Sequence, residues 1–323
     1  MSATALPVRR AAFGVALELE GIDVPSLDAG VRAPAAAEPR TRVRRVAARE
    51  IAARWADARP ERARELRGRD GRLLLSVDAD PVQGYLMRTP RDGRFLVPPD
   101  GLEVLCAPLA RAARSWTDLL VGQLLPLVAT LRGLEVLHAS AVALDRGALL
   151  FTAPAGAGKT SAALRLVLEG ARLLADDAVA IDAHGDRLLA HPGAGALAVR
   201  REEQRRLRRG ERARLGGARR SAGKTRYDVS TAGGPVPVAA MFMLGRTDST
   251  RPIVRRLDPV DPFRLLAGTF NLSVRTPERL RRQLDLCARL ADEVPVLSLD
   301  VPPTVDAGTL AACVREWATE RRS

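Results

Sequence analysis

Hydrophobic positions in the second half of the chain follow two alternating periodicities. Residues 159–169 and 276–293 repeat apolar side chains every three or four positions, which predicts helices, and a third helical stretch begins at Asp306. Four apolar runs are typical of buried strands, at 133–154, 172–181, 236–246 and 294–301. This alternation of strands and helices predicts an α/β domain over residues 134–323.

The first part of the chain, residues 1–108, has strand-like stretches instead of long helical repeats. Asp-Gly pairs separate several of them and favour turns. These stretches lie at 13–22, 72–79, 84–89 and 94–105. The arginine-rich segment 35–72 is compatible with a helix or with a mobile excursion from a small sheet. We therefore expect a smaller N-terminal accessory domain, either β-rich or α+β.

Residues 109–133 join the two parts. Their apolar side chains recur at helical spacing, which predicts a connecting helix. Pro126 lies within this stretch, and we expect a kink or a break there because proline cannot donate the helical hydrogen bond.

The composition places the chain among soluble globular proteins. It has 323 residues, of which 28% are charged and 46% are hydrophobic. The three cysteines are widely spaced and form no pair suited to a metal or a redox couple. Glu18 and Glu20 interrupt the N-terminal apolar patch, and no apolar run approaches the roughly 20 residues needed to cross a membrane. We expect a cytoplasmic protein with no membrane association.

The formal net charge of +13 indicates an anionic partner, such as a nucleotide, a nucleic acid, an acidic peptide or an acidic lipid. Much of it lies in residues 200–226, where eleven Arg and one Lys face three Glu. This segment is either a solvated helix or an anion-binding lid that brings Lys224 and Arg226 to a phosphate or an acidic substrate. Aromatic residues hardly interleave with the arginines, which argues against nucleic acid.

The segment Ala153–Thr160, "APAGAGKT", matches the Walker A pattern that cradles phosphates. Small residues let successive backbone N–H groups turn toward a phosphate, the Lys159 ammonium reaches the β- and γ-phosphates, and the Thr160 hydroxyl is suited to Mg²⁺. Lys159 is one of only two lysines among 51 basic residues. The nucleotide-binding residues predicted from this motif are Ala155, Gly156, Ala157, Gly158, Lys159, Thr160 and Ser161.

The same pattern occurs a second time at 218–225, "ARRSAGKT". A hydrophobic strand precedes the first match and a helix follows it, whereas the second match comes after a basic, polar run and leads into "RYDVSTAGG", which is not helical. We therefore assign nucleotide binding to the first match and not to the second.

Asp176 and Asp177 follow the Walker lysine by 17 and 18 residues. They lie within the apolar stretch "LLADDAVAI", which favours burial over two solvated turn aspartates. Adjacent side chains of a regular strand face opposite ways, but at a strand end both can turn toward one Mg²⁺. The pair is therefore a candidate catalytic and metal site.

Residues His138–Ile181 resemble the catalytic core of the HPr kinase/phosphorylase family, whose fold is related to that of PEP carboxykinase. The resemblance rests on a His ahead of the phosphate loop, the loop itself, a helix, and the sequence "ADD". It implies that Asp176 receives the proton of the attacking hydroxyl, that Asp177 and Thr160 hold Mg²⁺, and that His138 lies near the transferring phosphate. An isolated His at such a position also has a structural explanation.

The family's second signature, with a metal-contacting Glu before Ile-Arg-Gly, is absent. The sequence "GALAVRREEQRR" stands at that distance, and Glu202 is the residue that could replace the missing one. The resemblance extends to the HPr-kinase-like peptide kinases of bacterial peptide-modification clusters, and related kinases form homo-oligomers. It implies a kinase that transfers the γ-phosphate of Mg-ATP to Ser or Thr of a peptide or small protein. The alternatives are an ATP-binding regulatory protein without transfer and a nucleic-acid-associated NTPase or RNA kinase.

Overall fold

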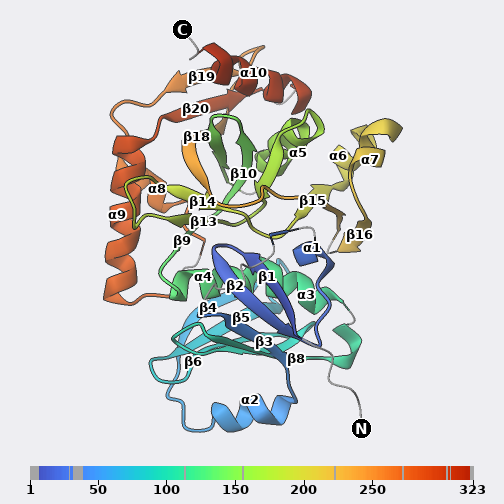
Figure 1. Ribbon diagram of the computed structural model, residues 1–323, viewed down its shortest axis with the longest axis vertical. Coiled ribbons are helices and arrows are strands. Elements are labelled where there is room, and N and C mark those ends of the chain that lie inside the picture. The colour runs from blue at the N-terminus through green and yellow to red at the C-terminus, as the bar shows by residue number, and fades with distance from the viewer. Residues whose placement is uncertain are drawn as a thin grey trace.

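The computed structural model describes residues 7–28, 30–31, 39–112, 114–154, 156–221, 223–270, 273–302, 305 and 307–320. They form a mixed α/β structure with three sheets, of eight, nine and three strands. Figure 1 shows the eight-stranded sheet in the lower half and the other two in the upper half. Within the described residues, no helix is both long and apolar enough to span a membrane.

The N-terminal part folds into the eight-stranded sheet, in the order β1-β2-β3-β8-β7-β6-β5-β4. Its strands are β1 Val8–Ala12, β2 Val15–Glu20, β3 Thr41–Arg45, β4 Glu61–Arg67, β5 Leu73–Asp80, β6 Gly84–Thr89, β7 Gly93–Val97 and β8 Glu103–Pro108. The helix α1 (Pro25–Asp28) follows β2, and α2 (Ala48–Arg54) buries Ile51 against β6, β7 and β8 on the outer face. The strands expected near 13–22, 72–79, 84–89 and 94–105 are confirmed.

The arginine-rich segment 35–72 is neither one helix nor an excursion from the sheet. Its described residues supply two strands of the sheet, β3 and β4, with α2 between them. In β3, Thr41 and Val43 are buried while Arg42 is exposed. Their alternation has the period of a strand and places Arg42 on the solvent side.

The connecting segment 109–133 is helical over most of its length but not uniform. A 3₁₀ turn (Ala110–Ala112) is followed by α3 (Ser115–Leu119), the π-helical turn η2 (Leu120–Leu124) and α4 (Leu125–Leu131). Pro126 lies in the first turn of α4, directly after the π turn. The missing N–H of Pro126 is thus accommodated by a change of helix type instead of a break.

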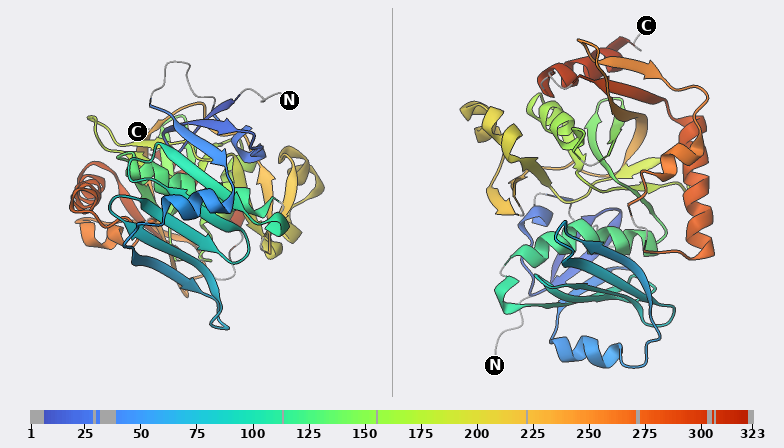
Figure 2. Two further views of the ribbon diagram at one scale, coloured as in Figure 1. Left: turned by 90° about the horizontal axis from the view of Figure 1, so that it is seen from below. Right: turned by 180° about the vertical axis from the view of Figure 1, so that it is seen from behind.

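This helical segment lies between the eight-stranded sheet and the rest of the protein, as the right view of Figure 2 shows. Leu120, Leu124 and Val128 share one buried apolar cluster with sheet residues such as Leu17 and Phe95. The same cluster includes alanines from the C-terminal half, among them Ala178, Ala180 and Ala194. The two halves are therefore packed on a common core.

The C-terminal part is built on the nine-stranded sheet, in the order β12-β10-β11-β18-β14-β13-β9, with β20 beside β18 and β19 beside β20. Its strands are β9 Glu135–Leu137, β10 Ala139–Leu144, β11 Gly147–Thr152, β12 Arg172–Ala175, β13 Val179–Asp182, β14 Leu189–His191, β18 Val236–Arg246, β19 Ile253–Arg256 and β20 Val296–Val301. The central strand β11 runs parallel to β18 and antiparallel to β10. The carboxyl end of β11 thus lies beside the start of β10.

Helices cover both faces of this sheet. One core cluster contains α5 (Lys159–Leu168) and α10 (Ala307–Glu320), and a second contains α8 (Pro262–Leu266) and α9 (Pro277–Glu293). Thr276 caps α9, because its hydroxyl accepts a hydrogen bond from the Arg279 N–H at 3.3 Å. The expected start of the terminal helix, Asp306, lies outside the described residues.

The stretch 172–181, expected as one strand, is two. β12 ends at Ala175 and pairs with β10, whereas β13 begins at Val179 and pairs with β9 and β14. Asp177, in the break, has a φ of +66°, in the left-handed region that aspartate tolerates better than most residues. The backbone therefore leaves the first strand at the aspartate pair.

The basic segment 200–226 is neither a single helix nor a simple loop. It forms the short helices α6 (Arg201–Arg206) and α7 (Arg209–Arg214), which project outward in Figure 1, and the strands β16 (Ala218–Ser221) and β17 (Lys224–Asp228). With β15 (Ala196–Arg200) these strands make the three-stranded sheet. The second Walker-like match is thus part of a hairpin, as expected for a sequence that is not a phosphate loop.

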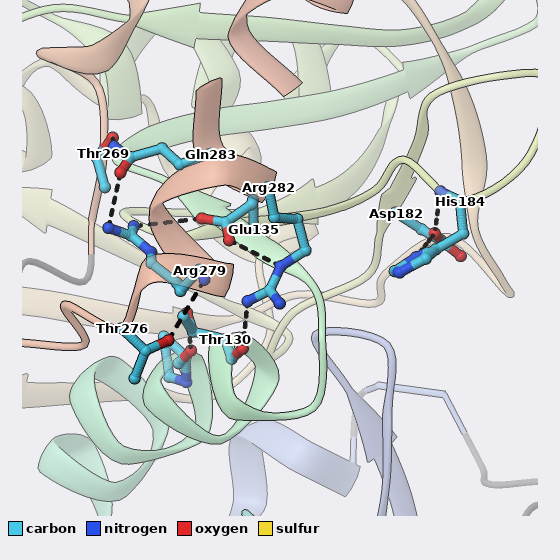
Figure 3. A network of polar contacts seen from close by, with 10 residues as sticks. Thr130, Glu135, Asp182, His184, Thr269, Thr276, Arg279, Arg282 and Gln283 are labelled. Carbon is cyan, nitrogen blue, oxygen red and sulfur yellow. Dashed lines mark hydrogen bonds and ion pairs between the residues drawn. The ribbon is translucent and has the colours of Figure 1, made fainter. Parts of the chain in front are cut away.

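A buried ionic network joins α9 to β9 and α4 (Figure 3). Glu135 Oε1 accepts a hydrogen bond from Arg282 Nε at 3.0 Å, and Arg279 Nη2 lies 3.2 Å from Glu135 Oε2. Arg279 also donates to Gln283, which in turn donates to the Thr269 hydroxyl. Burial raises the pKa of Glu135, and the two arginines oppose that shift. The network fixes α9 against the strand that leads to His138.

Glu135→Gln is expected to destabilise the protein by about 2 kcal/mol, because hydrogen bonds to charged groups contribute roughly 1.5–3 kcal/mol and two guanidiniums lose their shared negative charge. Urea unfolding followed by circular dichroism measures the change. The matched control is Glu293→Gln on α9, whose carboxylate pairs with Arg289 at the surface and should matter little. Equal effects of the two substitutions would contradict the prediction.

Candidate functional site

The loop after β11 turns sharply into α5. Gly156 and Gly158 have φ values of +90° and +111°, which side chains disfavour, and Gly158 is the N-cap of the helix. The Ala162 N–H donates to the Gly158 carbonyl at 2.9 Å and closes the first helical turn. Ala155 lies outside the described residues. The loop therefore combines glycine-dependent backbone turns with the positive end of a ten-residue helix.

Lys159 begins this helix and is 6% exposed. Its Nζ donates to the Ala153 carbonyl at 2.8 Å and lies 3.3 Å from His138 Nε2. Burial lowers the pKa of Lys159, while the carboxylates of Asp177 and Asp176 oppose this shift. The ammonium is thus bound to a carbonyl of the phosphate loop and lies close to the aspartate pair.

His138 joins the lysine to the aspartate pair. Its Nδ1 lies 2.9 Å from the carbonyl oxygen of Asp177. A carbonyl only accepts and an ammonium only donates, so the hydrogen sits on Nδ1 and Nε2 accepts from Lys159. The imidazole therefore orients the Lys159 ammonium and the strained backbone of Asp177 at once.

Asp176 is the point where three segments meet. Its Oδ1 accepts hydrogen bonds from the Ser140 hydroxyl at 2.6 Å and the Thr160 hydroxyl at 2.9 Å. Its Oδ2 accepts from the Ala198 N–H at 3.1 Å. Desolvation raises the pKa of Asp176 and the neighbouring Asp177 raises it further, while these three hydrogen bonds oppose the shift. Both oxygens of this carboxylate already have protein partners.

Asp177 is placed differently. Its side chain is 42% exposed, and its Oδ2 lies 3.8 Å from Lys224 Nζ. The left-handed backbone, fixed by His138, turns this carboxylate away from β12. Asp177 is thus the more accessible of the two carboxylates.

A cleft of about 680 Å³ lies over these groups. It is lined by most of the site residues predicted from the sequence: His138, Gly156, Gly158, Lys159, Thr160, Ser161, Asp176, Asp177, Lys224 and Arg226. Ala157 is in the loop but not on the lining, and Glu202 is exposed on α6. Glu203 lies on the lining instead, where it accepts a hydrogen bond from Arg165 at 2.8 Å. The geometry therefore gives Glu202 no place in the cleft.

Several residues of the site were not singled out in the sequence. Arg200, the last residue of β15, places its guanidinium over the phosphate loop, 3.1 Å from where a Cβ on Gly156 would lie. Ser140 follows His138 by two residues, and Asp118 on α3 forms an ion pair with Arg226 at 3.4 Å. Only the position of Ser140 beside His138 gave a local signal, because the others are brought in by tertiary structure.

No protein-family model matches this sequence, and no curated protein matches it either. Among solved structures, the chain is similar to the Hpr(Ser) kinase/phosphatase from Coxiella burnetii, with 14% sequence identity and a TM-score of 0.31. The match covers 58% of this chain and 96% of that chain.

The donor set is suited to an anion with a hard divalent cation. Backbone turns, a helix start, Lys159 and Arg200 surround the loop and favour phosphate oxygens. The Thr160 hydroxyl and the two carboxylates are oxygen ligands of the kind Mg²⁺ takes together with phosphates. Within the described residues there is no cluster of three or more His, Cys, Asp and Glu suited to a metal.

Proposed function

We propose that this protein is a kinase that transfers the γ-phosphate of Mg-ATP to a hydroxyl group of a peptide or small protein. The observation that carries the proposal is the hydrogen bond from Thr160 to Asp176 at 2.9 Å, beside a buried Lys159. This hydrogen bond joins the first turn of α5, directly after the phosphate loop, to the aspartate pair that follows β12. Enzymes that bind ATP or GTP through a phosphate loop use this combination of loop, lysine, hydroxyl and carboxylate.

The loop and the lysine hold the triphosphate in this proposal. Lys159 exchanges its bond to the Ala153 carbonyl for the β- and γ-phosphates, and Arg200 adds a second cation above Gly156. Thr160 and Asp176 would hold Mg²⁺, which neutralises charge on the phosphates when it is bound. ATP and Mg²⁺ are thus the proposed nucleotide and metal.

The chemical step needs a group that accepts the proton of the attacking hydroxyl. The hydroxyl oxygen forms a bond to the γ-phosphorus while the bond from that phosphorus to the β,γ-bridging oxygen breaks, and ADP leaves. The sequence resemblance assigns the proton to Asp176 and the metal to Asp177. The contacts support the reverse, because Asp176 is held by three donors and Asp177 is the accessible carboxylate. We assign proton acceptance to Asp177.

The accessory part, residues 1–108, together with the connecting helices, forms the opposite wall of the cleft in this proposal and receives the acceptor. Arg64, Asp118 and Gln123 belong to that wall. Lys224 and Arg226, both from β17, lie between the two walls and are placed to contact the transferred phosphate or the acceptor.

The test is incubation of the purified protein with Mg-ATP and a pool of Ser- and Thr-containing peptides, followed by mass spectrometry. We expect peptides that gain one phosphate group, and no gain with ATP omitted. Tight nucleotide binding without any phosphorylated product would instead favour the regulatory alternative, in which nucleotide occupancy acts as a switch.

Gly156→Ala is expected to weaken Mg-ATP binding by about tenfold. The left-handed φ costs a side chain roughly 1–2 kcal/mol, and the new Cβ would meet the Arg200 guanidinium at 3.1 Å. Isothermal titration calorimetry measures the change in Kd. Gly185→Ala is the matched control, because a Cβ there meets nothing within 4 Å and its φ is not left-handed. An unchanged Kd for Gly156→Ala would argue against a phosphate cradle at this loop.

A further inference from the structure

Arg64 lies on the wall of the cleft that faces the phosphate loop. It comes from β4, in the N-terminal sheet, and shares that wall with Gly122 and Gln123 of the π turn η2. The loop, Lys159 and the aspartate pair lie on the other wall. A molecule that reaches Asp177 from the cleft is therefore in a position to meet Arg64.

A β-bulge aims Arg64 at the cleft. Arg62 pairs with Asp78 and Arg64 with Val77, so Ala63 is an extra residue that β5 does not match. The Ala63 carbonyl accepts a hydrogen bond from Arg275 Nη2 at 3.3 Å. Bulges re-aim the side chains that follow them and are frequent next to active sites.

A second irregularity holds the side chain in place. Gln123 belongs to the π turn, and its Oε1 accepts a hydrogen bond from Arg64 Nη1 at 3.3 Å. π turns are rare and often occur at functional sites. Two local departures from regular structure, in different elements, thus meet at one guanidinium.

The charge of Arg64 is not balanced by the protein. Its strand neighbours are paired, Arg62 with Asp78 at 2.5 Å and Arg67 with Glu65 at 2.6 Å. For Arg64, the described residues provide no carboxylate within ion-pair distance, only the neutral amide of Gln123. Burial lowers the pKa of Arg64, as expected for a cation with no opposite charge beside it. A half-buried guanidinium of this kind is a ready partner for an anion.

We propose that Arg64 binds a carboxylate of the acceptor, so that the substrates of the site are hydroxyl-bearing peptides with an acidic group near the hydroxyl. The inference rests on the proposed kinase function and specifies its substrate class. A guanidinium pairs with a carboxylate through two parallel hydrogen bonds, which fixes orientation as well as affinity. Arg64 is thus a specificity residue, and the carboxylate belongs either to a side chain or to the chain terminus.

The experiment is a peptide array around a central Ser, with Glu or Gln at each flanking position and with free or amidated carboxyl termini. Radiolabelled ATP reports transfer by the wild type, Arg64→Gln and Arg64→Lys. The control is Arg67→Gln, the same change on the same strand at an exposed arginine already paired with Glu65. Thermal melting of every variant verifies folding.

We expect the wild type to prefer one acidic arm, either Glu at a single position or the free terminus. Arg64→Gln should raise KM for that peptide by about 10- to 100-fold, with a smaller change in kcat, and should treat the Glu and Gln peptides alike. Arg64→Lys should retain part of the preference, because it keeps the charge without the planar fork. Arg67→Gln should behave like the wild type.

The outcomes separate the two proposals. Transfer by the wild type without an acidic preference, or a preference that Arg64→Gln keeps, overturns the role of Arg64 and leaves the kinase proposal standing. Failure of the wild type to phosphorylate any peptide overturns the peptide-kinase proposal, and the acceptor subsite with it.

Discussion

Lys159→Ala should lower phosphoryl transfer by about 10²–10³-fold, the range found when one preorganised donor to developing charge is removed. The ammonium is buried at the first residue of α5, beside His138 and the aspartate pair. Without it, the carboxylates face the phosphates with one cation fewer at close range. Initial rates of ADP release in a coupled assay measure the loss.

The control for this variant is Arg187→Ala, which removes one positive charge at an exposed turn between β13 and β14. It should leave the rate unchanged. Lys159→Arg should not restore activity, because the planar guanidinium does not replace a compact ammonium in this space. Wild-type turnover by Lys159→Ala would remove the phosphate loop from the proposed mechanism.

Short-range sequence patterns predicted the strand, the loop and the helix that form the phosphate-binding part of the site. The apolar run that became β11, the small residues of the loop and the helical repeat of α5 are adjacent in the chain, so the motif and its context could be read together. The Thr276 cap and Pro277 likewise mark the start of α9 within a few residues. Such features depend on short-range hydrogen bonding and periodicity, which the sequence displays directly.

The opposite wall of the cleft could not be predicted in this way. Arg64 and Asp118 lie far from the loop in sequence, and only the packing of the connecting helices against both halves brings them near it. The break at Asp177 was missed because apolar residues flank it on both sides, as they would in one strand. The basic segment 200–226 was hard to interpret because charge shows exposure but does not separate short helices from an edge hairpin.

The two aspartates offer the clearest separation of roles within the proposed site. Asp177→Asn should leave the Kd for Mg-ATP within a few-fold of the wild type and lower kcat by about 10²–10⁴-fold, the usual contribution of a general base. Its side chain faces the cleft and, among the residues that the structure describes, pairs with Lys224 alone, so the fold loses little. Calorimetry with Mg-ATP and single-turnover transfer measure the two effects separately.

Asp176→Asn should instead affect Mg-ATP binding more than phosphoryl transfer. An amide cannot accept from Ser140, Thr160 and the Ala198 N–H together, because its nitrogen only donates, so the loop and β15 lose their common anchor. We expect weaker Mg-ATP binding and a lower melting temperature, with the remaining bound fraction still able to transfer. If Asp176→Asn instead binds Mg-ATP normally and transfers nothing, while Asp177→Asn transfers well, the assignment implied by the sequence resemblance is right and the one drawn from the contacts is wrong. The geometry favours Asp177 because a proton acceptor needs an oxygen that the acceptor hydroxyl can reach, and both oxygens of Asp176 are already engaged.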